Sequence, residues 1–127
     1  MNEIERETTR NLREAILFVG NLHGLGFGKP IVQKLVETEL GCRQINVEKG
    51  VPLPVNYLGE TIRTYKMRHI LLERNIICGI TALQDSISHH DISKIKSYLR
   101  ALKLRTGLAV NFGKSKLEIK GVRDEQA

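Results

Sequence analysis

The sequence predicts one α/β (α+β) domain, a mixed β-sheet flanked by helices in the order ααβββ(β)αββ. Apolar residues recur at helical spacing in the first third of the chain. Short apolar runs separated by turn residues follow, and a later amphipathic helical pattern divides the last runs from the earlier ones. Elements in this order pack in layers around a sheet. The length of 127 residues fits a single domain, 1–127, whose polar ends 1–8 and 121–127 are predicted as tails.

Two helices are predicted before the first strand. Thr8 or Thr9 can cap the first helix. Its apolar stripe consists of Leu12, Ala15, Ile16, Val19 and Leu22. The glycine-rich run 24–28 ends this helix, Pro30 suits the first turn of the second, and Gly41 is the predicted stop.

The central part of the sequence predicts strands. These are 45–47, 51–57, 61–73, 76–80, 108–112 and 117–119. Pro52 and Pro54 favour an edge position for the second of them, because proline cannot donate to a sheet ladder. Residues 58–60 are predicted as a turn, and residues 74–75 as a tight hairpin.

A third helix is predicted over 91–104, with apolar and basic residues on different faces. Asp91 is interpreted as its N-cap, which leaves His89 and His90 in the preceding loop. Three consecutive residues rarely point at one ion, so we prefer this interpretation to a metal site. No metal and no cofactor are therefore expected.

Positive charge is concentrated near the C-terminal end. The net charge is +6, and segment 92–117 contains seven basic residues and no acidic one. These candidate nucleic-acid-binding residues are Lys94, Lys96, Arg100, Lys103, Arg105, Lys114 and Lys116. A stretch of one sign attracts nucleic acid or another anionic partner, although a solvated helix face gives the same pattern. No aromatic residue alternates with these charges, so no base-stacking platform is predicted.

Composition excludes several protein classes. The longest apolar runs are four or five residues, too short to span a membrane, and no signal peptide is recognised. Cys42 and Cys78 provide neither a disulfide framework nor a four-ligand zinc site. A cytoplasmic location is expected, because a reducing compartment suits this cysteine content.

Three local strings resemble a known family. Residues 39–59, ELGCRQINVEKGVPLPVNYLG, are similar to a segment of the GxxExxY family, which belongs to the PD-(D/E)XK nuclease-like superfamily. Residues 98–112, YLRALKLRTGLAVNF, resemble its helix-then-strand segment, and 24–26 stand where it has Gly-Pro-Gly. The resemblance covers roughly 12–113 and implies a PD-(D/E)XK-like fold.

The motif that gives the family its name is altered. Counted from Gly26, Lys29 and Val32 stand where the family has its Glu and Tyr. A helical Gln of the family corresponds to Lys94. The resemblance therefore implies that an acid of the family's site is replaced by a base.

The remaining motif positions are altered too. The family's metal-binding Asp corresponds to Arg68, or to His69 if the register shifts by one residue. Its Glu-x-Lys corresponds to Gly79 and Thr81, within a segment 74–84 that contains no Asp, Glu or Lys. Metal-dependent cleavage needs clustered carboxylates to hold Mg²⁺. We therefore expect no catalytic residues and no enzyme activity.

Three functions stay open, and the first of them is preferred, because no recognised nucleic-acid motif or aromatic reader accompanies the basic residues. The first is an inactive nuclease-like domain serving as an assembly module, a homodimer or higher oligomer (a filament, if contacts run head to tail) or a binder of another protein. The second is nucleic-acid binding without cleavage through the basic helix 94–105. The third is a metal-dependent nuclease whose ligands have migrated to Glu60, Glu73, Asp85 and Asp91. No membrane partner is expected.

Overall fold

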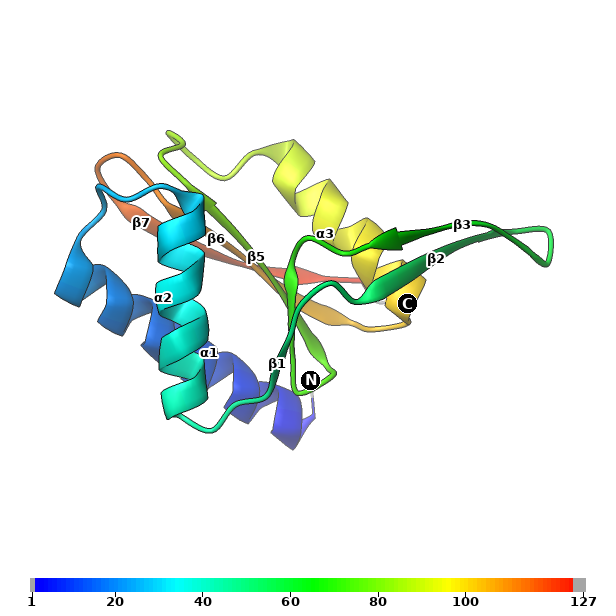
Figure 1. Ribbon diagram of the computed structural model, residues 1–127, viewed down its shortest axis with the longest axis horizontal. Helices are drawn as coiled ribbons and strands as arrows, with labels where there is room; N and C mark the ends of the chain where they lie inside the picture. The colour runs from blue at the N-terminus through cyan, green and yellow to red at the C-terminus, as the bar shows by residue number, and fades with distance from the viewer. Residues whose placement is uncertain (1, 125–127) are drawn as a thin grey trace.

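The computed structural model describes residues 2–124 and has three layers (Figure 1). Helices α1 (Glu3–His23) and α2 (Lys29–Cys42) pack on one face of a five-stranded sheet, and α3 (His89–Leu102) packs on the other. The mixed α/β architecture predicted from the sequence is confirmed. No helix among the described residues is long and apolar enough to cross a membrane.

The five-stranded sheet has the order β1-β4-β5-β6-β7. Its strands are β1 (Val47–Glu48), β4 (Ile70–Leu72), β5 (Ile76–Ala82), β6 (Thr106–Phe112) and β7 (Leu117–Arg123). Strands β5 and β6 are parallel and are joined through α3, while the other neighbours are antiparallel. Every residue of β6 is buried, as expected for a strand that helices cover on both faces.

Alternation along β5 divides the core in two. Ile76, Cys78 and Ile80 face α1 and α2, whereas Ile77 faces α3. Because side chains on a strand alternate between faces, the next odd positions, 79 and 81, also lie on the α3 side. This alternation sets the floor of the candidate site.

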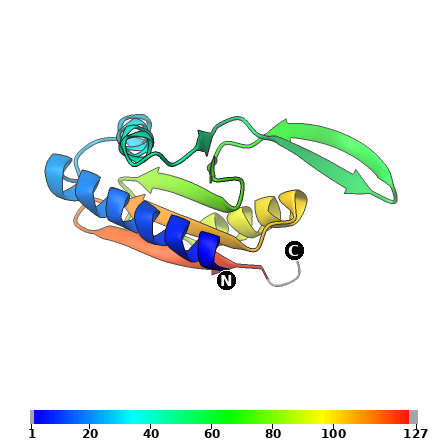
Figure 2. The same ribbon diagram turned by 90° about the horizontal axis from the view of Figure 1, so that it is seen from below.

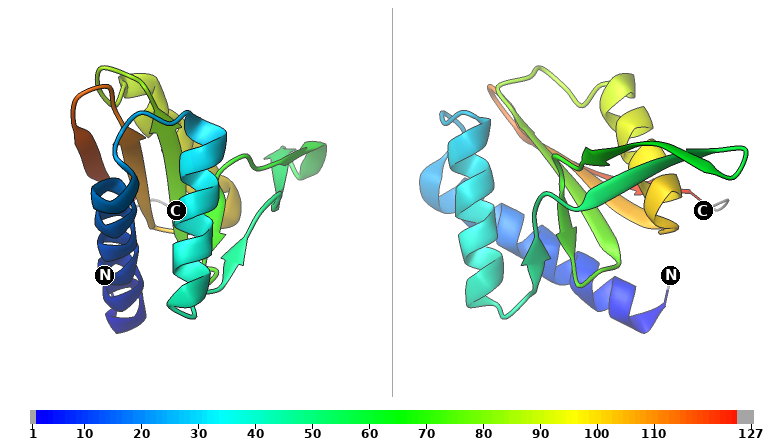
Figure 3. Two further views of the ribbon diagram at one scale, coloured as in Figure 1. Left: turned by 60° about the vertical axis from the view of Figure 1, so that its left-hand side comes forward. Right: turned by 45° about the vertical axis from the view of Figure 1, so that its right-hand side comes forward.

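Strands β2 (Pro52–Tyr57) and β3 (Glu60–Lys66) form a separate two-stranded hairpin. It projects from the body of the domain, as Figures 2 and 3 show. Leu58 and Gly59 both have positive φ at its tip, the conformation that a two-residue hairpin turn requires. Leu53 anchors the base of the hairpin in the core beneath α3.

The single strand predicted over 61–73 is wrong, because the chain divides there between two sheets. Met67 is buried in the core beneath α3, and its N–H donates to the Val51 carbonyl at 2.8 Å. The chain bends at this point so that Ile70–Leu72 can join the main sheet. The strand predicted over 51–57 is accordingly an arm of the hairpin rather than an edge of the main sheet.

The start of α1 also differs from the prediction. Asn2 caps the helix by accepting from the Glu5 N–H at 2.8 Å. Residues 3–8, predicted as part of a tail, are its first turns. Thr8 and Thr9 are buried inside the helix and do not cap it. Because Thr8 and Thr9 are buried within the helix, the cap is the residue that precedes its first turn, Asn2.

The start of α3 lies two residues earlier than predicted. Ser88 is the N-cap, and its hydroxyl accepts from the Asp91 N–H at 3.1 Å. The Asp91 carboxylate accepts in return from the Ser88 N–H at 2.9 Å, which completes a capping box. His89 and His90 are thus the first residues of the helix rather than part of a loop.

Two further boundaries need correction. Helix α2 continues past Gly41 to Cys42. Strand β7 continues to Arg123, so residues 121–123 of the predicted C-terminal tail are paired with β6. Residues 125–127 of that tail lie outside the described part of the chain.

Candidate functional site

Three of the positions that the sequence resemblance aligned with the family's motif meet in space. His69 precedes β4, and Gly79 and Thr81 lie on the α3 face of β5. Together with Asp91 at the start of α3, they line a cavity of about 10 Å³. A space of this size holds about one water molecule.

The imidazole of His69 fills the space that a side chain at position 79 would need. A Cβ placed on Gly79 would lie 2.7 Å from Nε2 of His69. The ring also meets Tyr98 edge to face, with centroids 5.2 Å apart. His69 is 7% exposed, and its Nδ1 has no hydrogen-bond partner among residues 2–124. Glycine on β5 and histidine before β4 are therefore complementary in shape.

The electrostatics keep this histidine neutral. Burial, followed by the positive charges of Lys29 and Lys94, lowers the pKa of His69 to about 4, although Asp91 opposes the shift. Burial also lowers the pKa of Lys29, and the nearby charges of Lys94 and Arg68 lower it further. An imidazole with this pKa carries no charge at neutral pH.

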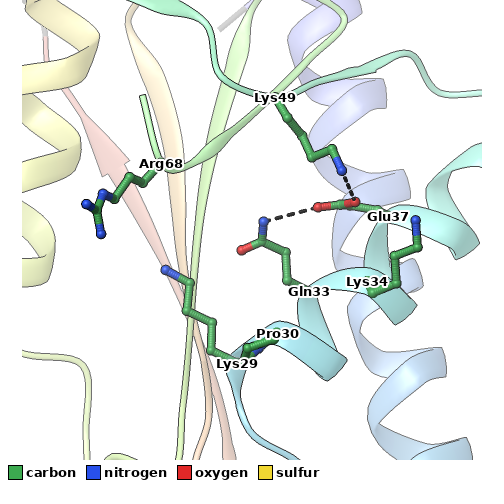
Figure 4. A pocket seen from close by; sticks show the side chains of 7 residues that line it. All are labelled: Lys29, Pro30, Gln33, Lys34, Glu37, Lys49 and Arg68. Atoms are coloured by element: carbon green, nitrogen blue, oxygen red, sulfur yellow. Dashed lines mark hydrogen bonds and ion pairs between the residues drawn. The ribbon is translucent and has the colours of Figure 1, made fainter. Parts of the chain in front are cut away.

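Three cations from separate parts of the chain lie near the buried imidazole. Lys29 begins α2, Arg68 lies between β3 and β4, and Lys94 lies on α3. Figure 4 shows Lys29 extending from the start of its helix toward Arg68. Their mutual effect on the pKa of Lys29 reflects repulsion between like charges. A bound anion would relieve that repulsion.

Two grooves meet at Arg68. One, of about 300 Å³, lies beside α2 and is lined by Lys29, Pro30, Gln33, Lys34, Glu37, Lys49 and Arg68. The other, of about 370 Å³, lies between the hairpin and α3. Glu37 is the single acid lining either groove, and Lys49 pairs with it at 3.3 Å. The surface that the two grooves form is thus strongly positive.

The residues present do not fit Mg²⁺. Within residues 2–124 no group of three His, Cys, Asp or Glu side chains is placed to hold a metal ion. Glu60 is at the hairpin tip, and Glu73 is in the turn after β4, where it accepts from the Asn46 N–H. Asp85 faces Lys114 at 3.8 Å. The proposed migrated ligands therefore lie on separate parts of the molecule.

Asp91, the fourth of those acids, is already engaged in hydrogen bonds. Its carboxylate accepts from Nε2 of Gln84 at 3.1 Å, in addition to the Ser88 N–H. Burial raises the pKa of Asp91, but these hydrogen bonds outweigh burial and hold its pKa below the ordinary value. Asn111, which is fully buried, fixes the same loop by donating to the Gln84 carbonyl at 3.0 Å. The Asp91 carboxylate therefore stabilises the N-terminal end of α3 and the loop before it.

Of the seven basic residues predicted to bind nucleic acid, Lys94 is the one that lines these grooves. Lys94 belongs to the site, but Lys96 lies two residues further along α3 and is therefore turned to another side. Arg100 pairs with Asp124 at 2.6 Å. Arg105 precedes β6 and Lys114 follows it, so the length of a seven-residue strand, about 23 Å, separates them.

Lys103 and Lys116 are also remote from Lys94. Lys103 is the C-cap of α3, in a left-handed conformation. Lys116 belongs to the turn between β6 and β7. Figure 1 shows that turn at the end of the domain away from the hairpin. The positive charge at the site comes instead from residues far apart in the sequence, such as Lys29, Arg68 and Lys94.

The mixed α/β fold agrees with comparison to known families. A family model described as the PD-(D/E)XK nuclease superfamily matches residues 6–122. The chain belongs to this superfamily. Comparison with curated proteins and with solved structures gave no match.

Sequence reasoning missed the second groove. Tyr65 on β3 and Tyr98 on α3 line it together, although they are far apart in the chain. Two signals were available. Arg63 and Tyr65 are two residues apart on β3 and therefore share one face of the strand. Tyr98 follows Lys94 by one helical turn. Neither signal reveals that the hairpin folds beside the helix.

Proposed function

We propose that this nuclease-superfamily domain binds the phosphates of nucleic acid and does not cleave them. One observation carries the proposal: Lys29, Arg68 and Lys94 surround the place where the resemblance to the GxxExxY family assigns acids and a Gln. The domain is accordingly proposed to be a relative of that family that has lost its catalytic acids.

The replacement makes physical sense for binding. In a metal-dependent nuclease, carboxylates hold a cation, and that cation attracts the phosphate and activates water. Here Lys29, Arg68 and Lys94 supply positive charge directly, and no carboxylate cluster is present to hold Mg²⁺ among residues 2–124. The cations can therefore attract a phosphate, but they cannot hold a metal ion to activate water for cleavage. Such binding is independent of sequence and falls steeply with salt.

The packing of His69 supports the absence of cleavage. A carboxylate at position 79 would overlap the imidazole, since even a Cβ there approaches Nε2 to 2.7 Å. One substitution on β5 therefore does not rebuild an acidic site, because His69 must also leave. The loss of acids and the packing around them are consistent with one another.

The test measures the affinity for a fluorescent single-stranded oligonucleotide by anisotropy at several salt concentrations. Replacing Lys29, Arg68 and Lys94 together by Gln removes three positive charges at the site. If each contacts one phosphate, the slope of log K against log salt becomes shallower by about 2. The matched control replaces the exposed Lys96, Lys103 and Lys116 by Gln, which removes the same charge elsewhere.

The two variants separate a site from a general positive field. We expect the control to keep most of the wild-type affinity and slope. Equal losses of affinity in both variants would contradict a site at Arg68 and would favour diffuse attraction to the whole basic chain.

Self-association through the hairpin is a second candidate function. All seven residues of β3 are exposed, and the outer half of the hairpin carries Val55, Tyr57, Leu58 and Ile62 at 44–87% exposure. A two-stranded hairpin gains little stability alone, and exposed apolar groups of this kind mark contact surfaces. The proposed partner is the hairpin of a second copy, which buries the same side chains in return.

Light scattering after nuclease treatment tests this candidate. A mass well above 14.4 kDa, insensitive to salt and lost when Leu58 and Ile62 become Ser, would support assembly. A monomer at all protein concentrations would rule it out. Because both residues lie away from Arg68, the same variant should still bind the oligonucleotide.

A further inference from the structure

The groove between the hairpin and α3 combines features that rarely occur together on a surface. Its walls carry two tyrosines, several aliphatic side chains and three cations, and no acidic residue lines it. The lining residues are Leu53, Val55, Tyr65, Lys66, Arg68, Lys94, Ser97, Tyr98 and Ala101. Its volume of about 370 Å³ falls at the small end of the range for ligand sites.

One wall comes from the hairpin. Leu53 pairs with Tyr65, and Val55 pairs with Arg63, across β2 and β3. Directly opposed residues of an antiparallel pair share a face, so all four side chains lie on the side that turns toward α3. The Arg63 guanidinium lies 4.9 Å from the centre of the Tyr65 ring, and Tyr65 itself is 49% exposed. An aromatic surface is thus available beside a cation.

The opposite wall comes from α3. Lys94, Ser97, Tyr98 and Ala101 recur at helical spacing and line the groove. The Tyr98 ring is held in place by its edge-to-face contact with the buried His69. The groove is therefore built on the same histidine that fills the altered nuclease site, and Arg68 connects the two.

We propose that this groove receives one unstacked base of a single-stranded nucleic acid, with an adjoining phosphate against Arg68 and Lys94. The inference rests on the proposed function and specifies its substrate class. A base presents a flat π surface next to a negative charge, which matches tyrosines next to cations. An apolar protein segment would match the aliphatic wall but would leave Lys66, Arg68 and Lys94 without a charged partner in the groove.

Duplexes do not satisfy the same groove. Bases within a duplex are stacked and paired, so their faces do not reach a side-chain wall, whereas unpaired bases can be splayed onto aromatic groups. A duplex can still contact the cations through its backbone. We therefore expect a preference for single strands over duplexes, in addition to the attraction that both share.

The experiment compares three labelled ligands of equal length in the same anisotropy titration: an oligothymidylate, an abasic strand with the same number of phosphates, and a duplex. Wild-type protein should bind the oligothymidylate about tenfold more tightly than the abasic strand. Tyr65→Leu keeps an apolar side chain but removes the aromatic face, and it should abolish most of that difference. The control is Phe18→Leu, which removes an exposed aromatic ring on α1, across the sheet from the groove.

A second variant, on the other wall of the groove, shows whether the effect of Tyr65→Leu comes from the groove or from a local change in the hairpin. Ser97→Leu narrows the groove from α3 without altering charge, and it should weaken binding of the oligothymidylate while leaving the abasic strand unaffected. Circular dichroism checks that each variant is folded.

The outcomes distinguish the two proposals. Equal affinity for the three ligands, unchanged by Tyr65→Leu and Ser97→Leu, would overturn the base groove and leave phosphate binding intact. Absence of binding to every ligand at low salt would overturn both. A change of mass rather than of oligonucleotide affinity in Tyr65→Leu would also overturn the inference, because it would assign the groove to a second copy.

Discussion

Strands β6 and β3 are both seven residues long, yet every residue of one is buried and every residue of the other is exposed. Strand β6 has a neighbour on each side and helices above and below. Strand β3 has one neighbour, β2, and projects from the body. The comparison separates two roles: the sheet holds the domain together, and the hairpin offers surface for contacts.

The candidate site lies where these two regions join. Met67 follows the hairpin and is buried in the core, Arg68 lines both grooves, and His69 packs against β5. A change in the sheet should therefore alter stability, and a change on the groove-lining face of the hairpin should alter binding of the oligonucleotide. A change at the junction should affect both.

The largest expected effect is in the sheet, and a matched pair of substitutions measures it. Ile77→Ala removes a side chain that is 0% exposed, whereas Ile62→Ala removes one that is 62% exposed on the hairpin. We expect the first to lower the free energy of unfolding by about 2–5 kcal/mol, and the second to change it by no more than about 0.5 kcal/mol. Urea denaturation measures both. Similar losses would contradict the division of roles.

The next effect is the pH dependence from His69. Its pKa is lowered to about 4 in the folded protein from 6.5, so the unfolded state binds more protons between these values. Stability is therefore fully present above pH 6.5 and is lost as pH falls toward 4, by on the order of 3 kcal/mol. The lowered pKa of Asp91 contributes stability above its ordinary value of 3.8, and that stability is lost only as pH falls below 3.8.

Denaturation curves at several pH values test this prediction. His69→Phe removes the titrating group, and it should flatten the dependence between pH 4 and 6.5. An unchanged dependence in that variant would assign the effect to other groups.

The complementarity of Gly79 and His69 gives a smaller effect. Gly79→Ala should destabilise by about 1–3 kcal/mol, because the new methyl group meets the imidazole at 2.7 Å. In a His69→Ala background the same substitution should have little effect, which gives a coupling energy of about 0.5–3 kcal/mol. Additive losses in the double variant would show that the two positions do not share the space.

The smallest effect concerns α3, the wall that both regions share. Ser88→Ala removes the N-cap and should destabilise by about 1 kcal/mol. Ser86→Ala, in the exposed loop before it, is the control. A loss of oligonucleotide affinity in the first variant and not in the second would show that the helix must be anchored to form the groove. Thermal unfolding and anisotropy measure the two effects.

The sequence was most informative where packing repeats along the chain. The spacing of Leu12, Ile16 and Val19 predicted the buried face of α1, and the apolar run before Gly79 predicted β5. Local patterns of this kind reflect one face of one element, so they can be recognised without knowing its neighbours. Boundaries were less accurate, because Asn2 and Ser88 compete with nearby residues that can also cap a helix.

Contacts between segments far apart in the sequence could not be predicted from such local patterns. The chain bends at Met67 because its side chain packs into the core beneath α3. That contact is not visible in the local sequence, which therefore predicted one continuous strand. The resemblance located His69 and Gly79 at altered motif positions, and the structure brings them together. That the imidazole would fill the space above the glycine depends on distance rather than on residue type. The groove between Tyr65 and Tyr98 depends likewise on how the hairpin docks.

The most direct test of binding without cleavage follows one labelled single strand by anisotropy and by denaturing gel in the same sample, with Mg²⁺, with Mn²⁺ and with EDTA. We expect the strand to be bound in all three conditions and to stay full length, and binding to be lost when Lys29, Arg68 and Lys94 become Gln. Metal-dependent cleavage that disappears on changing Glu60, Glu73, Asp85 or Asp91 would contradict the proposed function.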